Sequence, residues 1–140
     1  HENFEEPFID NLIINAAAVD QKDHDKWIEQ LNFQKHIYIN SNGKDMNLIG
    51  LRIFSSKKMQ LGEDPEMPFA SNASYVSFTE AVGASLPPGP SHSYFFASVT
   101  KESDRIKTYY TTILNGYLVD FEDQDMFYGN SEYLSYSIKF

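Results

Sequence analysis

The sequence has 140 residues, no cysteine and a formal net charge of −9, and 41% of its residues are hydrophobic and 15% aromatic. This composition excludes a disordered chain and predicts a single domain over residues 1–140 with one buried core. The acidic balance argues against nucleic acid as a partner, the absence of cysteine excludes disulfides and thiolate metal sites, and no apolar run is long enough for membrane insertion.

The first half of the sequence predicts short strands separated by polar connections. Residues 1–7 indicate a flexible lead-in, and the apolar run 8–14 predicts the first strand. The charged stretch 20–26 leads into a segment that is compatible with a short helix over about 21–31 or with a strand. Asn42-Gly43 predicts a tight turn, because this pair adopts positive φ easily. Further strands are predicted over residues 35–40, 48–55 and 75–79, and a long loop over residues 57–72.

The second half predicts more strands and closes with the clearest one. Residues 94–100 and 106–114 predict a hairpin, and residues 117–121 continue the sheet. The prolines of segment 86–90 exclude a regular helix or a central strand there. Residues 134–140 alternate apolar and polar side chains, the pattern of a half-buried strand. Roughly eight short, evenly spaced strands predict an all-β, mainly antiparallel barrel or sandwich with at most one short helix.

Residues that carry chemistry are scattered along the sequence. The four histidines, at positions 1, 24, 36 and 92, have no metal-ligand spacing. His24 lies between Asp23 and Asp25, which is open to a metal site but is better explained by a solvated loop. Trp27 is either a ligand platform or part of the core. There is no serine-nucleophile, phosphate-loop or dinucleotide motif, so the sequence predicts a protein that is not an enzyme and holds no cofactor and no metal.

Five segments are similar to the haemolysin-coregulated protein (Hcp) family. Residues 8–14 lie where the family has its first strand, and residues 95–122 resemble its penultimate hairpin. Residues 20–33, with Lys26-Trp27-Ile28-Glu29 at their centre, resemble the family's charged loop and strand, D-x-K-H-x-x-W-I-E-V-L-S-F. Residues 77–85 resemble its S-F-T-K-x-V-D-x-A-S motif, and residues 132–140 resemble its closing strand.

The resemblance implies a closed β-barrel whose copies form a ring, a hexamer in this family. Such rings stack into the tube of the bacterial type VI secretion system and carry effectors. The resemblance therefore implies a structural virulence protein that resides in the bacterial cytoplasm and is then secreted, with itself and secretion-system or effector proteins as partners. The candidate interface residues come from two predicted loops, 20–26 and 57–72, and from Trp27, which directly follows the first loop. They are Asp23, His24, Asp25, Trp27, Met59, Leu61 and Met67.

Two other classes of function stay open at this point. A secreted or surface β-sandwich that binds a carbohydrate or protein ligand would use the tyrosines, and it predicts a monomer that its ligand stabilises. An acidic immunity or inhibitor protein would bind one basic toxin molecule through charge complementarity. A measurement of solution mass separates both classes from a ring.

Overall fold

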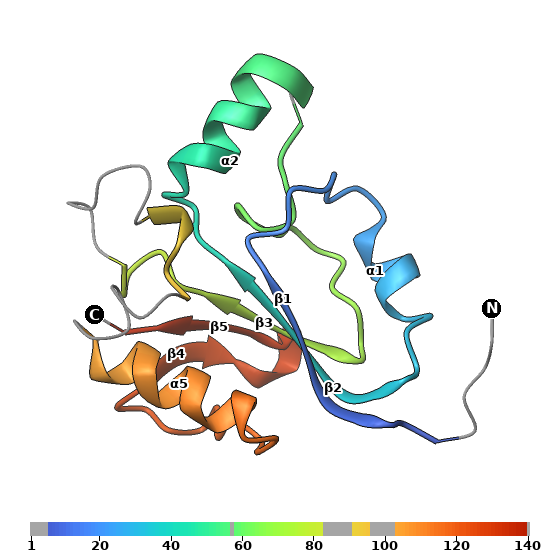
Figure 1. Cartoon of the computed structure of the whole chain (residues 1–140), viewed down its shortest axis with the longest axis vertical. Helices are drawn as coiled ribbons and strands as arrows, with labels where there is room; N and C mark the ends of the chain where they lie inside the picture. The colour runs from blue at the N-terminus through green and yellow to red at the C-terminus, as the bar shows by residue number, and fades with distance from the viewer. Residues whose placement is uncertain (1–5, 57, 83–90, 96–102, 140) are drawn as a thin grey trace.

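The computed structural model describes residues 6–56, 58–82, 91–95 and 103–139. Five strands form one sheet in the order β1-β2-β3-β5-β4 (Figure 1). The neighbours β1, β2, β3 and β5 are parallel, and β4 pairs antiparallel with β5 at one end of the sheet. The strands are β1 (Ile9–Asn15), β2 (Gln34–Ser41), β3 (Ala73–Ser77), β4 (Phe127–Asn130) and β5 (Ser135–Ile138).

Helical segments connect these strands, so the prediction of an all-β antiparallel barrel or sandwich is wrong. α1 (His24–Ile28) lies between β1 and β2, and α2 (Met46–Leu51) with the π-helical turn Arg52–Ser56 lies between β2 and β3. α5 (Asp104–Leu114) precedes β4, and the short turn Ser131–Tyr133 joins β4 to β5. No helix in the described ranges has the length and apolar run needed to cross a membrane. Parallel neighbours require crossover connections, which is why the chain folds as an α/β domain.

α5 occupies residues for which the sequence predicted a strand. Its buried side chains are spaced by three, one and three residues, which places them on one face of a helix. The Ser103 side chain begins the helix by accepting a hydrogen bond from the Ile106 amide at 3.3 Å. The buried side chains are Ile106, Tyr109, Tyr110 and Ile113.

The other element predictions divide into confirmed strands and wrong ones. The strands predicted at 8–14, 35–40, 75–79 and 134–140 are confirmed as β1, β2, β3 and β5. The strand predicted at 48–55 is helical, because the Asp45 side chain caps the first turn of α2. Residues 117–121 form no strand, and neither do residues 94–95; the rest of the predicted strand 94–100, and segment 86–90, lie outside the described residues.

The sheet is covered on both faces, as parallel sheets usually are (Figure 1). Successive side chains of β2 point to opposite faces of the sheet. Tyr38 packs with the buried face of α5, whereas Ile37 and Ile39 pack with Ile28 of α1. The second core also contains Leu61 from the long connection before β3. Each face of the sheet thus contributes its own hydrophobic cluster.

Candidate functional site: an aspartate–histidine pair at the carboxyl edge of the sheet

Three parallel strands end at the same edge of the sheet. The register pairs Asn15 at the end of β1 with Asn40, and Ser41 at the end of β2 with Ser77 at the end of β3. α2 projects from this edge (Figure 1). In open parallel sheets, ligands and catalytic groups collect at the carboxyl ends of the strands. The connections that leave this edge are therefore the first place to look for a site.

The connection after β2 brings Asp45 against His92. Asp45 is completely buried, and its Oδ1 accepts hydrogen bonds from the amides of Asn47 at 3.0 Å and Leu48 at 3.1 Å. Its other oxygen, Oδ2, lies 2.7 Å from Nδ1 of His92. The His92 side chain keeps 33% of its surface exposed. The pair thus consists of an acid enclosed by the protein and an imidazole that still reaches solvent.

This arrangement determines the proton positions on the imidazole. A carboxylate only accepts hydrogen bonds, so Nδ1 of His92 carries the proton that it donates to Asp45. In the neutral ring, Nε2 is then the nitrogen with a free lone pair. A histidine oriented in this way by a buried acid can remove a proton from a hydroxyl group and later return it.

The two segments that carry the pair are tied together by buried polar contacts. Asn42 has no exposed surface, and its Nδ2 donates a 2.7 Å hydrogen bond to the carbonyl of Ser91, the residue before His92. The Ser91 hydroxyl accepts a hydrogen bond from the Met46 amide at 3.3 Å. On the other side, Thr79 after β3 accepts hydrogen bonds from the Gly43 amide and from Lys44 Nζ. The geometry of the pair is therefore supported from both flanking loops.

Below the pair lies a buried network of amide and phenol groups. The Tyr94 hydroxyl donates to the Asn40 carbonyl at 2.9 Å and accepts from the Ala16 amide at 3.1 Å. Tyr109 donates to Asn40 Oδ1 at 2.7 Å, and Tyr110 donates to an oxygen of the neighbouring Asn15 side chain at 2.9 Å. Burial raises the pKa of all three tyrosines, so their hydroxyls stay protonated as donors. This network links β1, β2, α5 and the His92 segment.

The sequence-predicted interface residues lie elsewhere, around α1. Five of them line one cleft of about 520 Å³: Asp23, His24, Asp25, Met59 and Met67. Trp27 on α1 is 38% exposed and does not line it, and Leu61 is completely buried in the core. The structure thus brings most of this set together but places Leu61 inside the protein.

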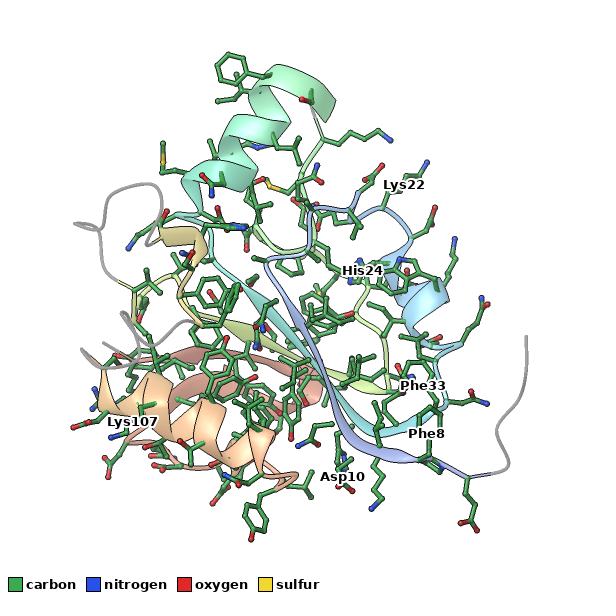
Figure 2. All side chains as sticks on the ribbon, in the orientation of Figure 1. Phe8, Asp10, Lys22, His24, Phe33 and Lys107 are labelled. Carbon is green, nitrogen blue, oxygen red and sulfur yellow. The ribbon has the colours of Figure 1, made fainter. Side chains whose placement is uncertain are left out.

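His24 is packed rather than solvated. Its side chain lies between α1 and the sheet (Figure 2), with only 2% of its surface exposed and its ring edge-on to Tyr75. Its Nδ1 lies 2.7 Å from the Gln21 carbonyl. The neighbouring Asp23 pairs with Lys26 at 2.6 Å, and this hydrogen bond lowers the pKa of Asp23. Across the described ranges, no three histidine, aspartate or glutamate side chains are grouped to hold a metal ion.

The Asp45–His92 pair is absent from the sites that the sequence indicated. The two residues are 47 positions apart, and no short motif spans that separation. A usable signal exists in the segment Asn42-Gly43-Lys44-Asp45, which follows a strand and precedes α2, where an acid caps the helix. The wrong strand prediction at 48–55 concealed this signal.

No family model, no curated protein and no solved structure matches this chain. The Hcp resemblance therefore stays a prediction, as do ring assembly, secretion and effector transport. The closed β-barrel that the resemblance implied is not the fold of the chain, because its described strands form an open, mostly parallel sheet.

Proposed function

We propose that the chain supplies the acid and the histidine of a catalytic triad that hydrolyses esters or amides. The observation that carries the proposal is the 2.7 Å contact between Oδ2 of buried Asp45 and Nδ1 of His92. By analogy, α/β-hydrolases have the same chain order, with the acid ahead of the histidine, and their triad also assembles at one end of a sheet. The proposal departs from the sequence-based prediction that the protein is not an enzyme.

The proposed reaction transfers one proton at a time through His92. Nε2 accepts the proton of the nucleophile's hydroxyl while the hydroxyl oxygen forms a bond to the acyl carbon. The same proton then goes to the leaving oxygen or nitrogen as its bond to the acyl carbon breaks. Water repeats these two steps to release the acid. Asp45 holds the ring in place and stabilises its cationic form.

The nucleophile of such a triad precedes the acid in chain order in α/β-hydrolases. Ser41 is the one serine, threonine or cysteine ahead of Asp45 in this sequence, and it is buried within β2 with 4% of its surface exposed. Ser41 therefore does not fit this role, and we propose that the nucleophile reaches Nε2 of His92 from the solvent-exposed side of the imidazole.

The test uses the complete polypeptide as the cell makes it, with a fluorophosphonate probe and an aryl ester as reagents. We expect serine labelling, and we expect His92→Ala and Asp45→Asn each to lower the rate of labelling and of ester turnover by about 10³–10⁴-fold. Matched controls are His36→Gln, which removes a half-buried histidine on β2, and Asp104→Asn, which removes an exposed carboxylate from α5. Labelling of both pair variants at the parental rate would reject the proposal.

A further inference from the structure

Asn42 is hydrogen-bonded to the backbone of Asp45 and to Ser91, the residue before His92. Asn42 has no exposed surface, and each of its polar groups has a hydrogen-bond partner. Its Oδ1 accepts from the Lys44 amide at 3.0 Å, and its carbonyl accepts from the Asp45 amide at 2.9 Å. These two contacts form the turn that presents the acid. Its backbone amide donates to the Gly62 carbonyl at 3.0 Å, which anchors the turn to the loop before β3.

The remaining group of Asn42 reaches the histidine segment. Nδ2 donates to the Ser91 carbonyl at 2.7 Å, directly before His92. Asn42 is thus bonded to the backbone of Asp45 and to the residue adjoining His92. Tyr94 holds the other side of the histidine, since its hydroxyl donates to the Asn40 carbonyl. The His92 segment is held at Tyr94 and at Ser91, where the Asn42 amide bond to the Ser91 carbonyl is the shorter contact and the bond from the Met46 amide to the Ser91 hydroxyl is the longer one.

We infer that Asn42 is a positioning residue, which sets the distance and angle between Asp45 and His92 through the amide bond from its Nδ2 to the Ser91 carbonyl. The inference rests on the proposed function. Small displacements of catalytic groups reduce rates strongly, with a 1 Å shift worth on the order of 10²-fold. Loss of this amide bond leaves Asp45 bonded to the first turn of α2 but removes the shorter of the two contacts that hold Ser91, so the backbone beside the imidazole can shift.

The informative substitution is Asn42→Asp, which nearly preserves the shape of the side chain. The new carboxylate still accepts from the Lys44 amide, yet it places an acceptor oxygen against the Ser91 carbonyl, where the parent has a donor. Asn42→Ser is the second variant, because a serine can accept from the turn but is too short to reach Ser91. The matched control is Asn115→Asp, which removes another amide-to-carbonyl hydrogen bond, from Asn115 Nδ2 to Thr111 at the exposed end of α5.

The first measurement is the proton spectrum of the complete polypeptide. The Nδ1 proton of His92 should give a low-field resonance, assigned by its loss in His92→Ala. We expect Asn42→Asp and Asn42→Ser to shift or broaden this resonance and to lower kcat about 10- to 100-fold with KM nearly unchanged. Asn115→Asp should retain both the resonance and kcat. Circular dichroism identifies any variant that fails to fold. If one of the two Asn42 variants does not fold, the other one tests the positioning role.

The outcomes separate this inference from the proposed function. A folded Asn42 variant with the parental resonance and parental kcat overturns the positioning role and leaves the catalytic pair intact. A parent protein with no such resonance, or with an ester turnover that survives His92→Ala, overturns the proposed function itself. A resonance that shifts only in the Asn42 variants, together with a fall in kcat, supports both.

Discussion

Asn40 shows how much of the fold depends on one side chain. It has no exposed surface, its Oδ1 accepts from Tyr109, and its Nδ2 donates to Asn15 Oδ1 at 2.7 Å and to the Tyr110 hydroxyl at 3.3 Å. A buried polar group that loses its partner raises the free energy of the folded state, because in the unfolded chain it bonds to water. Tyr109 therefore depends on Asn40 as its acceptor, whereas Tyr110 and Asn15 also bond to each other.

Asn40→Ala should lower the free energy of unfolding by about 3 kcal/mol, as the Tyr109 hydroxyl and its neighbours lose partners and a small cavity forms. Urea denaturation followed by circular dichroism measures the change. Asn32→Ala is the control, because Asn32 is exposed before β2, and its effect should stay within about 0.5 kcal/mol. Equal urea midpoints for the two variants would contradict this account of the network.

The same scale explains why the contact between Asp45 and His92 was not predictable from sequence, although Asp45 alone had a local signal as a helix cap. Asp45 and His92 meet only after β2 and β3 have been aligned and the chain has returned over the edge of the sheet. Neither residue belongs to a short motif, and Asn42-Gly43 before Asp45 predicted a simple turn. The site depends on tertiary structure, whereas the predicted cluster around His24 was visible because its residues are neighbours in sequence.

At the scale of elements, the loop before β3 is fitted closely against the chain leaving β1. The Gly62 amide donates to the Ala17 carbonyl at 2.9 Å, and its carbonyl accepts from Asn42. A Cβ added at Gly62 would lie 2.2 Å from the Ala17 nitrogen and 2.3 Å from the Ala16 carbonyl carbon. These neighbours are backbone atoms, so they cannot move aside without shifting the end of β1.

Gly62→Ala should therefore lower the free energy of unfolding by about 3 kcal/mol. Gly50→Ala is the opposite case: Gly50 lies in α2 with open space around the added Cβ, and alanine favours the helix by about 1 kcal/mol. Thermal unfolding of both variants should move the midpoint in opposite directions. A Gly62→Ala protein as stable as the parent would mean that this loop is not packed as described.

The strands were more predictable than the helices, for a physical reason. β1 was visible as an apolar run, and β5 was visible as an alternation of apolar and polar residues, both of which are typical of strands. α5 was mistaken for a strand since its sequence, DRIKTYYTTIL, is rich in tyrosine, threonine and isoleucine, which favour strands. It is helical because four large side chains at helical spacing are buried against the sheet, and that gain outweighs local propensity.

At the scale of the whole molecule, the sequence of β1 already indicated a parallel sheet, but it was interpreted as a strand of an antiparallel one. β1 is apolar on both parities, with Leu12 and Ile14 packed on one core and Ile13 on the other. An antiparallel sheet with one wet face would instead alternate. The three consecutive apolar residues 12–14 thus indicated a strand covered on both sides, which implies helices above and below the sheet.

The two-sided core also encloses most of the tyrosines, which gives the whole fold a pH limit. Burial raises the pKa of Tyr75 to about 12 and also raises the pKa of Tyr94, Tyr109 and Tyr110. In the unfolded chain each pKa is near 10. Above about pH 10 the unfolded chain therefore loses protons that the folded protein keeps, and mass action favours unfolding.

The buried tyrosines should contribute fully to the free energy of unfolding below about pH 10. As the pH rises toward about 12, the free energy of unfolding should fall by up to about 1.4 kcal/mol per pH unit for each buried tyrosine. Urea titrations at about pH 8 and about pH 11 measure the loss, and tyrosinate absorbance should rise together with unfolding. Tyr117→Phe, which removes a 69% exposed ring, should leave the pH dependence unchanged, whereas Tyr75→Phe should reduce it. A protein that stays equally stable while all its tyrosines ionise near pH 10 would contradict the burial of these phenols, because a phenolate cannot remain in either core without a compensating positive charge.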